Sequence, residues 1–143
     1  MSTRALYSFK DQNDCHSVYH HYDGYPANAL KLIYKAQEAA WTLPRFEANE
    51  FAAAFCCIAK DKTRGGTRLS LGPHMHGDLA YRYDIWVQND NLMVKIWEVN
   101  YSNEKLIDKG TINELWSKYV IPAVKKETVA KGNYIQTEKN EKE

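Results

Sequence analysis

The feature that most constrains the fold is a strict alternation of side-chain character over residues 79–88. A period of two residues is typical of a β-strand with one face in the core and one in solvent. The Asn-Asp-Asn segment at 89–91 has the composition of a tight hairpin turn, and the apolar-rich residues 92–100 follow it. These segments predict an antiparallel hairpin with one solvated face. The core-facing set is Leu79, Tyr81, Tyr83, Ile85 and Val87, and the opposite set is Ala80, Arg82, Asp84, Trp86 and Gln88.

The remaining elements follow from turn residues and helical periodicity. Polar turn formers at 11–14 separate two strand-like segments, and a capping-box pattern at 111–114 begins the last helix. The element order is ββααββββα. Because hairpins join most strands, we expect an α+β fold, with a largely antiparallel sheet of about six strands and two to three helices packed on one face. The expected strands are 4–9, 15–22, 67–71, 79–88, 92–100 and 105–109, and the expected helices are 26–41, 46–59 and a third from 111 that Pro122 kinks or splits.

The length of 143 residues fits one domain. We expect a single α+β domain over residues 1–131 and a charged, flexible tail over residues 132–143. No apolar stretch is long enough to cross a membrane, and the first residues lack a signal-peptide pattern. The three cysteines are an odd number with two adjacent, which is a poor disulfide framework and favours reduced thiols. These observations predict a cytoplasmic protein.

Charge and aromatic content narrow the classes of partner. The chain has 19 basic and 18 acidic residues and a net charge of +1, whereas a general nucleic-acid binder normally has a basic excess. It has ten Tyr and four Trp but only four Phe. Tyr and Trp combine an apolar body with a polar group and are enriched at interfaces. They fit either the edges of a small core or an exposed aromatic surface for a protein partner.

Two segments rich in His and Asp are the candidates for chemistry. Residues 20–26 read HHYDGYP and residues 72–78 read GPHMHGD. Imidazole and carboxylate groups bind metals, and the start of a helix after Asp23 favours an anion. Turn, capping and loop roles explain the same residues without any ligand. The catalytic candidates are His20, His21, Asp23, His76 and Asp78, and the metal candidates are His20, His74, His76 and Asp78.

The sequence contains no complete motif for a cofactor or for a catalytic nucleophile, so no cofactor is expected. The alternative is a divalent metal bound by the His and Asp residues. Adjacent strand residues point to opposite faces, so one of His20 and His21 is expected on the open face of the sheet beside His16. If the strand after Asp78 pairs with the N-terminal hairpin, the two segments converge. The sequence leaves that pairing open.

A binding surface is expected where polar and aromatic residues share the solvated face of the sheet. Trp and Arg are over-represented at interface hot spots, whereas an Arg–Asp row alone is a surface ion pair of small energetic value. A nucleic-acid site would instead require the basic residues to form one patch. The binding candidates are Tyr25, Arg68, Arg82, Asp84 and Trp86, and the basic patch would consist of Lys60, Lys62, Arg64, Arg68 and Arg82.

Four segments resemble a family of small uncharacterised proteins of bacteria, phages and other mobile elements. They are TRALYSF at 3–9, HYDGYP at 21–26, LPRFEANEFAAAF at 43–55 and HGDLAYRY at 76–83, and the similarity covers roughly residues 3–100. No activity is assigned to this family. The resemblance implies a phage-associated setting, in which small proteins often inhibit host defence systems, as anti-CRISPR and other anti-defence proteins do.

Three functions follow from these observations, in order of preference. The first is a non-catalytic interaction protein whose open sheet face and His/Asp loops bind a protein of a host defence complex, with a homo-oligomer as a further form of contact. The second is an enzyme or ligand-binding protein that uses a metal or a phosphate-bearing substrate at the His and Asp residues. The third is direct nucleic-acid binding through the basic patch. No membrane partner is expected.

Overall fold

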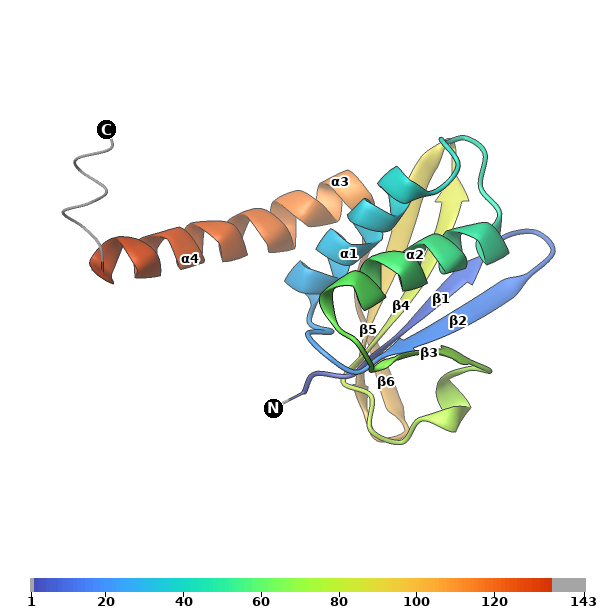
Figure 1. Cartoon of the computed structure of the whole chain (residues 1–143), viewed down its shortest axis with the longest axis horizontal. Helices are drawn as coiled ribbons and strands as arrows, with labels where there is room; N and C mark the ends of the chain where they lie inside the picture. The colour runs from blue at the N-terminus through green and yellow to red at the C-terminus, as the bar shows by residue number, and fades with distance from the viewer. Residues whose placement is uncertain (1, 135–143) are drawn as a thin grey trace.

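A computed structural model describes residues 2–134, which form one six-stranded sheet and the helices that pack on it (Figure 1). The strand order is β3-β2-β1-β4-β5-β6, and all neighbours are antiparallel except β1 and β4. The predicted α+β fold and the order ββααββββα are confirmed. The strands are β1 (Ala5–Lys10), β2 (Cys15–His20), β3 (Thr67–Ser70), β4 (Tyr81–Gln88), β5 (Asn91–Asn100) and β6 (Asn103–Thr111), and the helices are α1 (Pro26–Ala39), α2 (Ala48–Lys62), α3 (Ile112–Leu115) and α4 (Ile121–Tyr134).

The parallel pairing of β1 with β4 is the feature of the sheet that hairpin signals do not predict. After β1 the chain turns back into β2 on one side, and after β4 it turns into β5 on the other side. Asn89 and Asp90 have φ values of 52° and 61°, which is the conformation of a type I′ hairpin turn and agrees with the predicted turn. Because β1 and β4 run in the same direction and continue to opposite sides, the two strands separate beyond their carboxyl ends.

One face of the sheet forms the main core with α1 and α2. The Tyr7 ring lies 4.4 Å from the Phe55 ring and 5.1 Å from the Tyr83 ring, measured between centroids. The Phe9 ring lies 5.4 Å from that of Phe51. Aromatic contacts of this kind add to the area-dependent stabilisation of a core. The predicted core position of Tyr83 is therefore confirmed.

The opposite face of the sheet, which we call the open face, carries the second set of side chains. Arg82, Asp84 and Trp86 lie on it as predicted. They alternate along β4 with Tyr83 and Ile85, which belong to the main core. Further side chains of the open face, on other strands, include Leu6, Ser8, Lys10, Tyr19, Arg68, Lys95 and Trp97.

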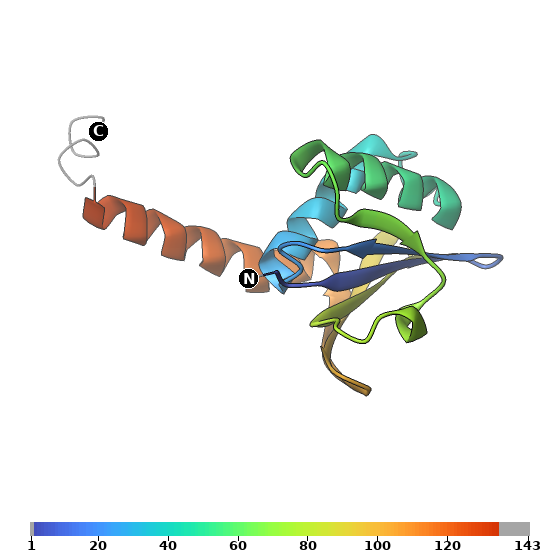
Figure 2. The same ribbon diagram turned by 60° about the horizontal axis from the view of Figure 1, so that its bottom comes forward.

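The segment between β3 and β4 crosses part of the open face (Figure 2). Leu79, in this segment, is buried with Leu6 and Tyr19 in a small cluster separate from the main core. The prediction that Leu79 points to the same side as Tyr83 was wrong. The cause is that β4 begins only at Tyr81, so strand alternation does not extend back to residue 79.

The last helical region begins with the predicted capping box. Thr111 Oγ1 accepts a hydrogen bond of 3.1 Å from the Glu114 backbone N–H, and Glu114 Oε1 accepts one of 2.9 Å from the Thr111 N–H. A π-helical turn, η2 (Trp116–Val120), separates α3 from α4, so the expected interruption lies just before Pro122. Helix α4 extends away from the sheet to Tyr134 (Figure 1), and residues 135–143 of the predicted tail lie outside the described residues.

Two further observations concern the cellular location that the sequence predicts. Among residues 2–134, no helix combines the length and the apolar character that a membrane crossing requires. Cys15, Cys56 and Cys57 are all free thiols.

Candidate functional site

The first His-rich segment places its two histidines in different surroundings. His20 ends β2 on the helix-covered side, is 3% exposed, and its Nδ1 lies 2.8 Å from Thr67 Oγ1 on β3. It shares a side of β2 with His16, as predicted, but that side is not the open face. His21 instead lies with its Nδ1 2.8 Å from the hydroxyl of Tyr19, an open-face residue. The expectation of an open-face histidine beside His16 was therefore wrong, because His16 and His20 alternate onto the core side.

The turn after His21 depends on a close backbone approach at Gly24. Asp23 has the left-handed backbone conformation in this turn, with φ of 51°. Gly24 is buried, donates a 2.8 Å hydrogen bond to the Thr3 carbonyl and accepts one from the Tyr83 hydroxyl. A Cβ at this position would lie 2.6 Å from Ala5 Cβ. Asp23 and Gly24 thus have the structural turn role that the sequence offered as one explanation.

The two His-rich segments meet at Tyr19 rather than at each other. The His76 ring stacks on the Tyr19 ring with centroids 4.6 Å apart and an interplanar angle of 12°. The guanidinium carbon of Arg68 lies 4.8 Å from the same ring centroid, while His21 binds the hydroxyl. Tyr19 therefore organises His21, Arg68 and His76 into one cluster.

The remaining candidates of the second segment bind other partners. His76 Nε2 lies 2.7 Å from Ser70 Oγ, and that hydroxyl also accepts from the Gly72 N–H at 3.2 Å. Asp78 forms an ion pair of 3.1 Å with Arg4. Within residues 2–134, no three His, Cys, Asp or Glu side chains converge as a metal-binding group. His74 and Tyr25, the other two candidates of these segments, are exposed.

Burial of His20 and His76 predicts a pH dependence of stability. Desolvation is the main cause that lowers the pKa of each imidazole below its ordinary value of 6.5. The unfolded chain therefore binds protons more readily than the folded protein, so stability is full above pH 6.5 and falls as the pH drops through that value. We expect the free energy of unfolding in urea to be lower at about pH 5 than at about pH 7.5.

The variant carrying His20→Gln and His76→Gln is expected to lose less stability over this pH range than the wild type. His16→Gln, at an exposed position, serves as the control and should keep the wild-type pH dependence. An unchanged difference between the two pH values in the double variant would contradict the assignment.

The predicted Arg82–Asp84–Trp86 row contains a closed network of charges. Asp84 is 5% exposed and accepts from Arg82 at 2.9 Å, from Trp97 Nε1 at 2.9 Å and from Lys10 at 3.2 Å. Arg82 also forms a 3.0 Å ion pair with Glu104. These contacts leave Asp84 and Arg82 with little capacity for an external partner, so Trp86 is the member of the row best placed to bind one.

Arg82 is not part of one patch with Arg68, as the predicted nucleic-acid site would require. Arg68 and Arg82 lie in one row of the open face but are separated by Tyr19 and Leu6. Three strand spacings amount to about 14 Å. Arg82 is neutralised by Asp84 and Glu104, and Lys60 donates to the Arg64 carbonyl at 3.2 Å. The side chain of Lys62 lies outside the described residues.

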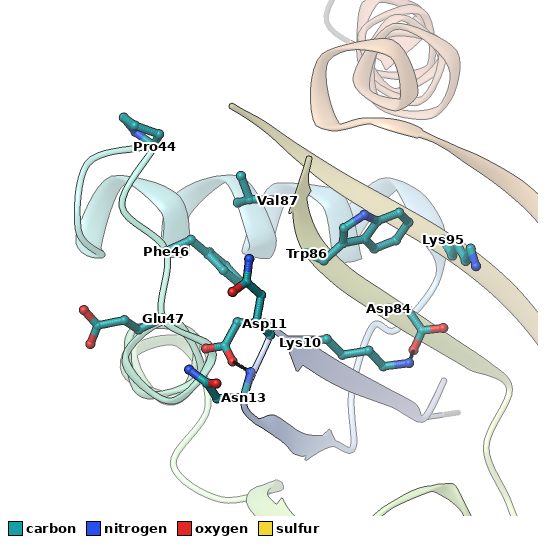
Figure 3. Close-up of a pocket in the computed structure, with 11 residues that line it drawn as sticks. Lys10, Asp11, Asn13, Pro44, Phe46, Glu47, Asp84, Trp86, Val87 and Lys95 are labelled. Atoms are coloured by element: carbon teal, nitrogen blue, oxygen red, sulfur yellow. Dashed lines mark hydrogen bonds and ion pairs between the residues drawn. The ribbon is translucent and has the colours of Figure 1, made fainter. Parts of the chain in front are cut away.

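A hollow of about 610 Å³ lies where β1 and β4 separate, and we call it the fork hollow (Figure 3). Three parts of the chain line it: the β1–β2 turn at 10–13, the segment before α2 at 44–47, and the strand residues Asp84, Trp86, Val87 and Lys95. Its volume falls within the range of about 300–1,000 Å³ that is usual for ligand sites.

Asp11 holds two walls of the fork hollow together. Its Oδ2 accepts a 2.7 Å hydrogen bond from the Ala48 N–H, which joins the β1–β2 turn to the first residue of α2. Its Oδ1 accepts from the N–H groups of Asn13 and Asp14. The Ala48 bond is the largest of the effects that lower the pKa of Asp11. Sequence patterns do not reveal this hollow, because Lys10, Phe46 and Lys95 approach one another only through the β1–β4 pairing.

A second hollow, of about 440 Å³, lies between the segment containing η1 (Pro73–Met75) and the β5–β6 hairpin. His74, His76 and Glu104 supply its polar groups. Large apolar side chains are exposed on the same two segments. These side chains, which we call the apolar rim, are Leu71 (84% exposed), Met75 (58%) and Tyr101 (85%).

Comparison of the chain with models of protein families, with curated proteins and with solved structures found no match. The phage-associated resemblance of the four sequence segments therefore stays a prediction.

Proposed function

We propose that this protein is a non-catalytic interaction protein that binds another protein through its apolar rim. The observation that carries the proposal is the exposure of Leu71 (84%) and Tyr101 (85%). Soluble monomers rarely expose large apolar side chains in groups, and groups of this kind mark interaction sites. Burial of one such side chain in a partner contributes about 1.5–3 kcal/mol.

The surroundings of the rim support a specific contact. The hollow beside it offers a concave surface, and His74 and Glu104 supply polar groups for hydrogen bonds at its border. A concave apolar centre with a polar border is the usual anatomy of a protein interface. Strand β3 pairs only with β2 among the described residues, so its outer edge is also available to a partner strand.

The contacts of Ser70 and His76 support binding rather than catalysis. A Ser–His pair at 2.7 Å has the spacing of a nucleophile and its base. The Ser70 hydroxyl, however, also bonds to the N–H and the carbonyl of Gly72, at 3.2 and 3.3 Å, and His76 is stacked on Tyr19. Hydrogen bonds of this kind are typical of a serine that closes a loop. The Ser70–His76 pair therefore fixes the segment that carries part of the apolar rim.

A host defence protein is the class of partner that the resemblance implies. Photo-crosslinking in bacterial cells tests the proposal whatever the identity of that partner. With a photoreactive phenylalanine analogue at position 71 or at position 101, we expect one crosslinked product of the same mass from both sites. A product of twice the 16.6 kDa chain mass would identify a second copy as the partner.

The matched control carries the analogue at position 35, an exposed residue of α1. With the partner purified, Leu71→Ser combined with Tyr101→Ser should weaken binding by at least about tenfold, since two buried apolar side chains are lost. Crosslinks that are absent at 71 and 101, or that are equally strong at 35, would refute the proposal.

A further inference from the structure

The fork hollow has the position of a ligand site in sheets with parallel strands. Pairing of β4 with β1 ends at Ile85, while β4 continues to Gln88 beside β5. The chain leaves β1 and β4 toward opposite sides of the sheet. In open α/β sheets, ligands bind in the crevice outside the carboxyl ends of strands where the connections change sides. The pair of β1 and β4 reproduces that local geometry.

The walls of the fork hollow combine an aromatic ring with cations. The Nζ atom of Lys95, which lines the hollow, lies 5.5 Å from the centroid of the Trp86 ring. The Nζ atom of Lys109, which stands on β6 beside the lining residues, lies 5.8 Å from the same centroid. Phe46 and Val87 supply apolar surface to the hollow, and Val87 directly follows Trp86 on β4 (Figure 3). An aromatic face beside two ammonium groups can hold a planar ring by stacking and an anionic group by charge.

The carboxylates of the hollow are neutralised by their own partners. Asp11 accepts three backbone N–H groups, Asp84 is bound by Lys10 and Arg82, and Glu47 pairs with Arg45 at 3.0 Å. In the described part of the chain, neither Lys95 nor Lys109 has a carboxylate within 4.0 Å. The uncompensated charge at Trp86 is therefore positive.

We propose that the fork hollow is a binding site for a small anion that carries a planar ring, of the chemical class of nucleoside monophosphates. The ring stacks on Trp86, and Lys95 and Lys109 hold the phosphate. The site is separate from the apolar rim and does not depend on the protein-binding function.

Calorimetric titration with AMP tests the site, with adenosine and inorganic phosphate as partial ligands. We expect saturable binding of AMP with a dissociation constant below about 1 mM, and binding of each partial ligand weaker by at least about tenfold. Lys95→Ala combined with Lys109→Ala should weaken AMP binding by at least about tenfold. Lys105→Ala, which removes an exposed lysine from the same strand β6, should leave it unchanged.

Two substitutions at Trp86 distinguish the loss of ring stacking from a general loss of structure. Trp86→Leu should weaken AMP binding by at least about tenfold, and Trp86→Phe should restore most of it because the ring is kept. A lack of saturable AMP binding, or equal binding by the double-lysine and Lys105→Ala variants, would overturn the site. A ten-nucleotide single strand that binds more tightly than AMP would overturn the assignment to a free small molecule. The crosslinking outcome at positions 71 and 101 is independent of all these results.

Discussion

Replacement of Asp84 by alanine is expected to lower the free energy of unfolding by about 3–5 kcal/mol, the cost of breaking a buried ion pair by removing one partner. Asp84 is 5% exposed and is the common acceptor of Lys10, Arg82 and Trp97. Its removal leaves the Arg82 guanidinium, whose side chain is 12% exposed, with only Glu104 as a counter-ion. Urea unfolding followed by circular dichroism measures the change.

Asp61→Ala is the matched control, because Asp61 is an exposed carboxylate near the end of α2. Surface substitutions of this kind change the free energy of unfolding by no more than about 0.5 kcal/mol. A loss of less than about 1 kcal/mol in Asp84→Ala would mean that water replaces the carboxylate, and the buried network would not be a determinant of stability.

Gly24→Ala is expected to lower the free energy of unfolding by about 3 kcal/mol, at the upper end of the usual cost of overpacking. The added Cβ would lie 2.6 Å from Ala5 Cβ and 2.8 Å from the Thr3 carbonyl oxygen. Neither neighbour is the flexible end of a side chain, so the start of β1 must shift. The shift also disturbs the hydrogen bond from Tyr83 to the Gly24 carbonyl in the core.

Gly77→Ala and Gly65→Ala are the controls for this substitution. A Cβ at either position meets no atom within 4 Å, and neither glycine has a positive φ that would strain alanine. Both variants should be close to wild-type stability or slightly more stable, since alanine restricts the unfolded chain. If Gly24→Ala were as stable as these controls, the approach of β1 to the β2–α1 turn would not be the reason for a glycine at position 24.

Much of the fold could be predicted because its signals are local. The alternation around Tyr83, the turn at Asn89 and Asp90, and the capping box at Thr111 each depend on residues only a few positions apart. The predicted ends of the helices were less accurate. The first helix ends at Ala39 rather than near 41, and the second begins at Ala48 rather than near 46, where Glu47 has an extended conformation.

The candidate sites were predicted only in part. Strand alternation correctly placed Arg82, Asp84 and Trp86 on one face. It could not reveal that Asp84 and Arg82 neutralise each other, or that His21 and His76 meet through Tyr19. Those contacts depend on how the side chains pack in three dimensions, and one sequence contains no signal for them.

The sequence by itself determined most of the secondary structure, the hairpins and the side of β4 that faces the core, because backbone geometry and burial of apolar side chains act over short distances along the chain. Only the tertiary structure decided that β1 lies parallel to β4. That pairing joins residues far apart in the chain, such as Ala5 and Tyr81, and depends on how the whole sheet packs on α1 and α2. The fork hollow is a consequence of this pairing, because residues 10–13 at the end of β1 and the residues of β4 and β5 line it together.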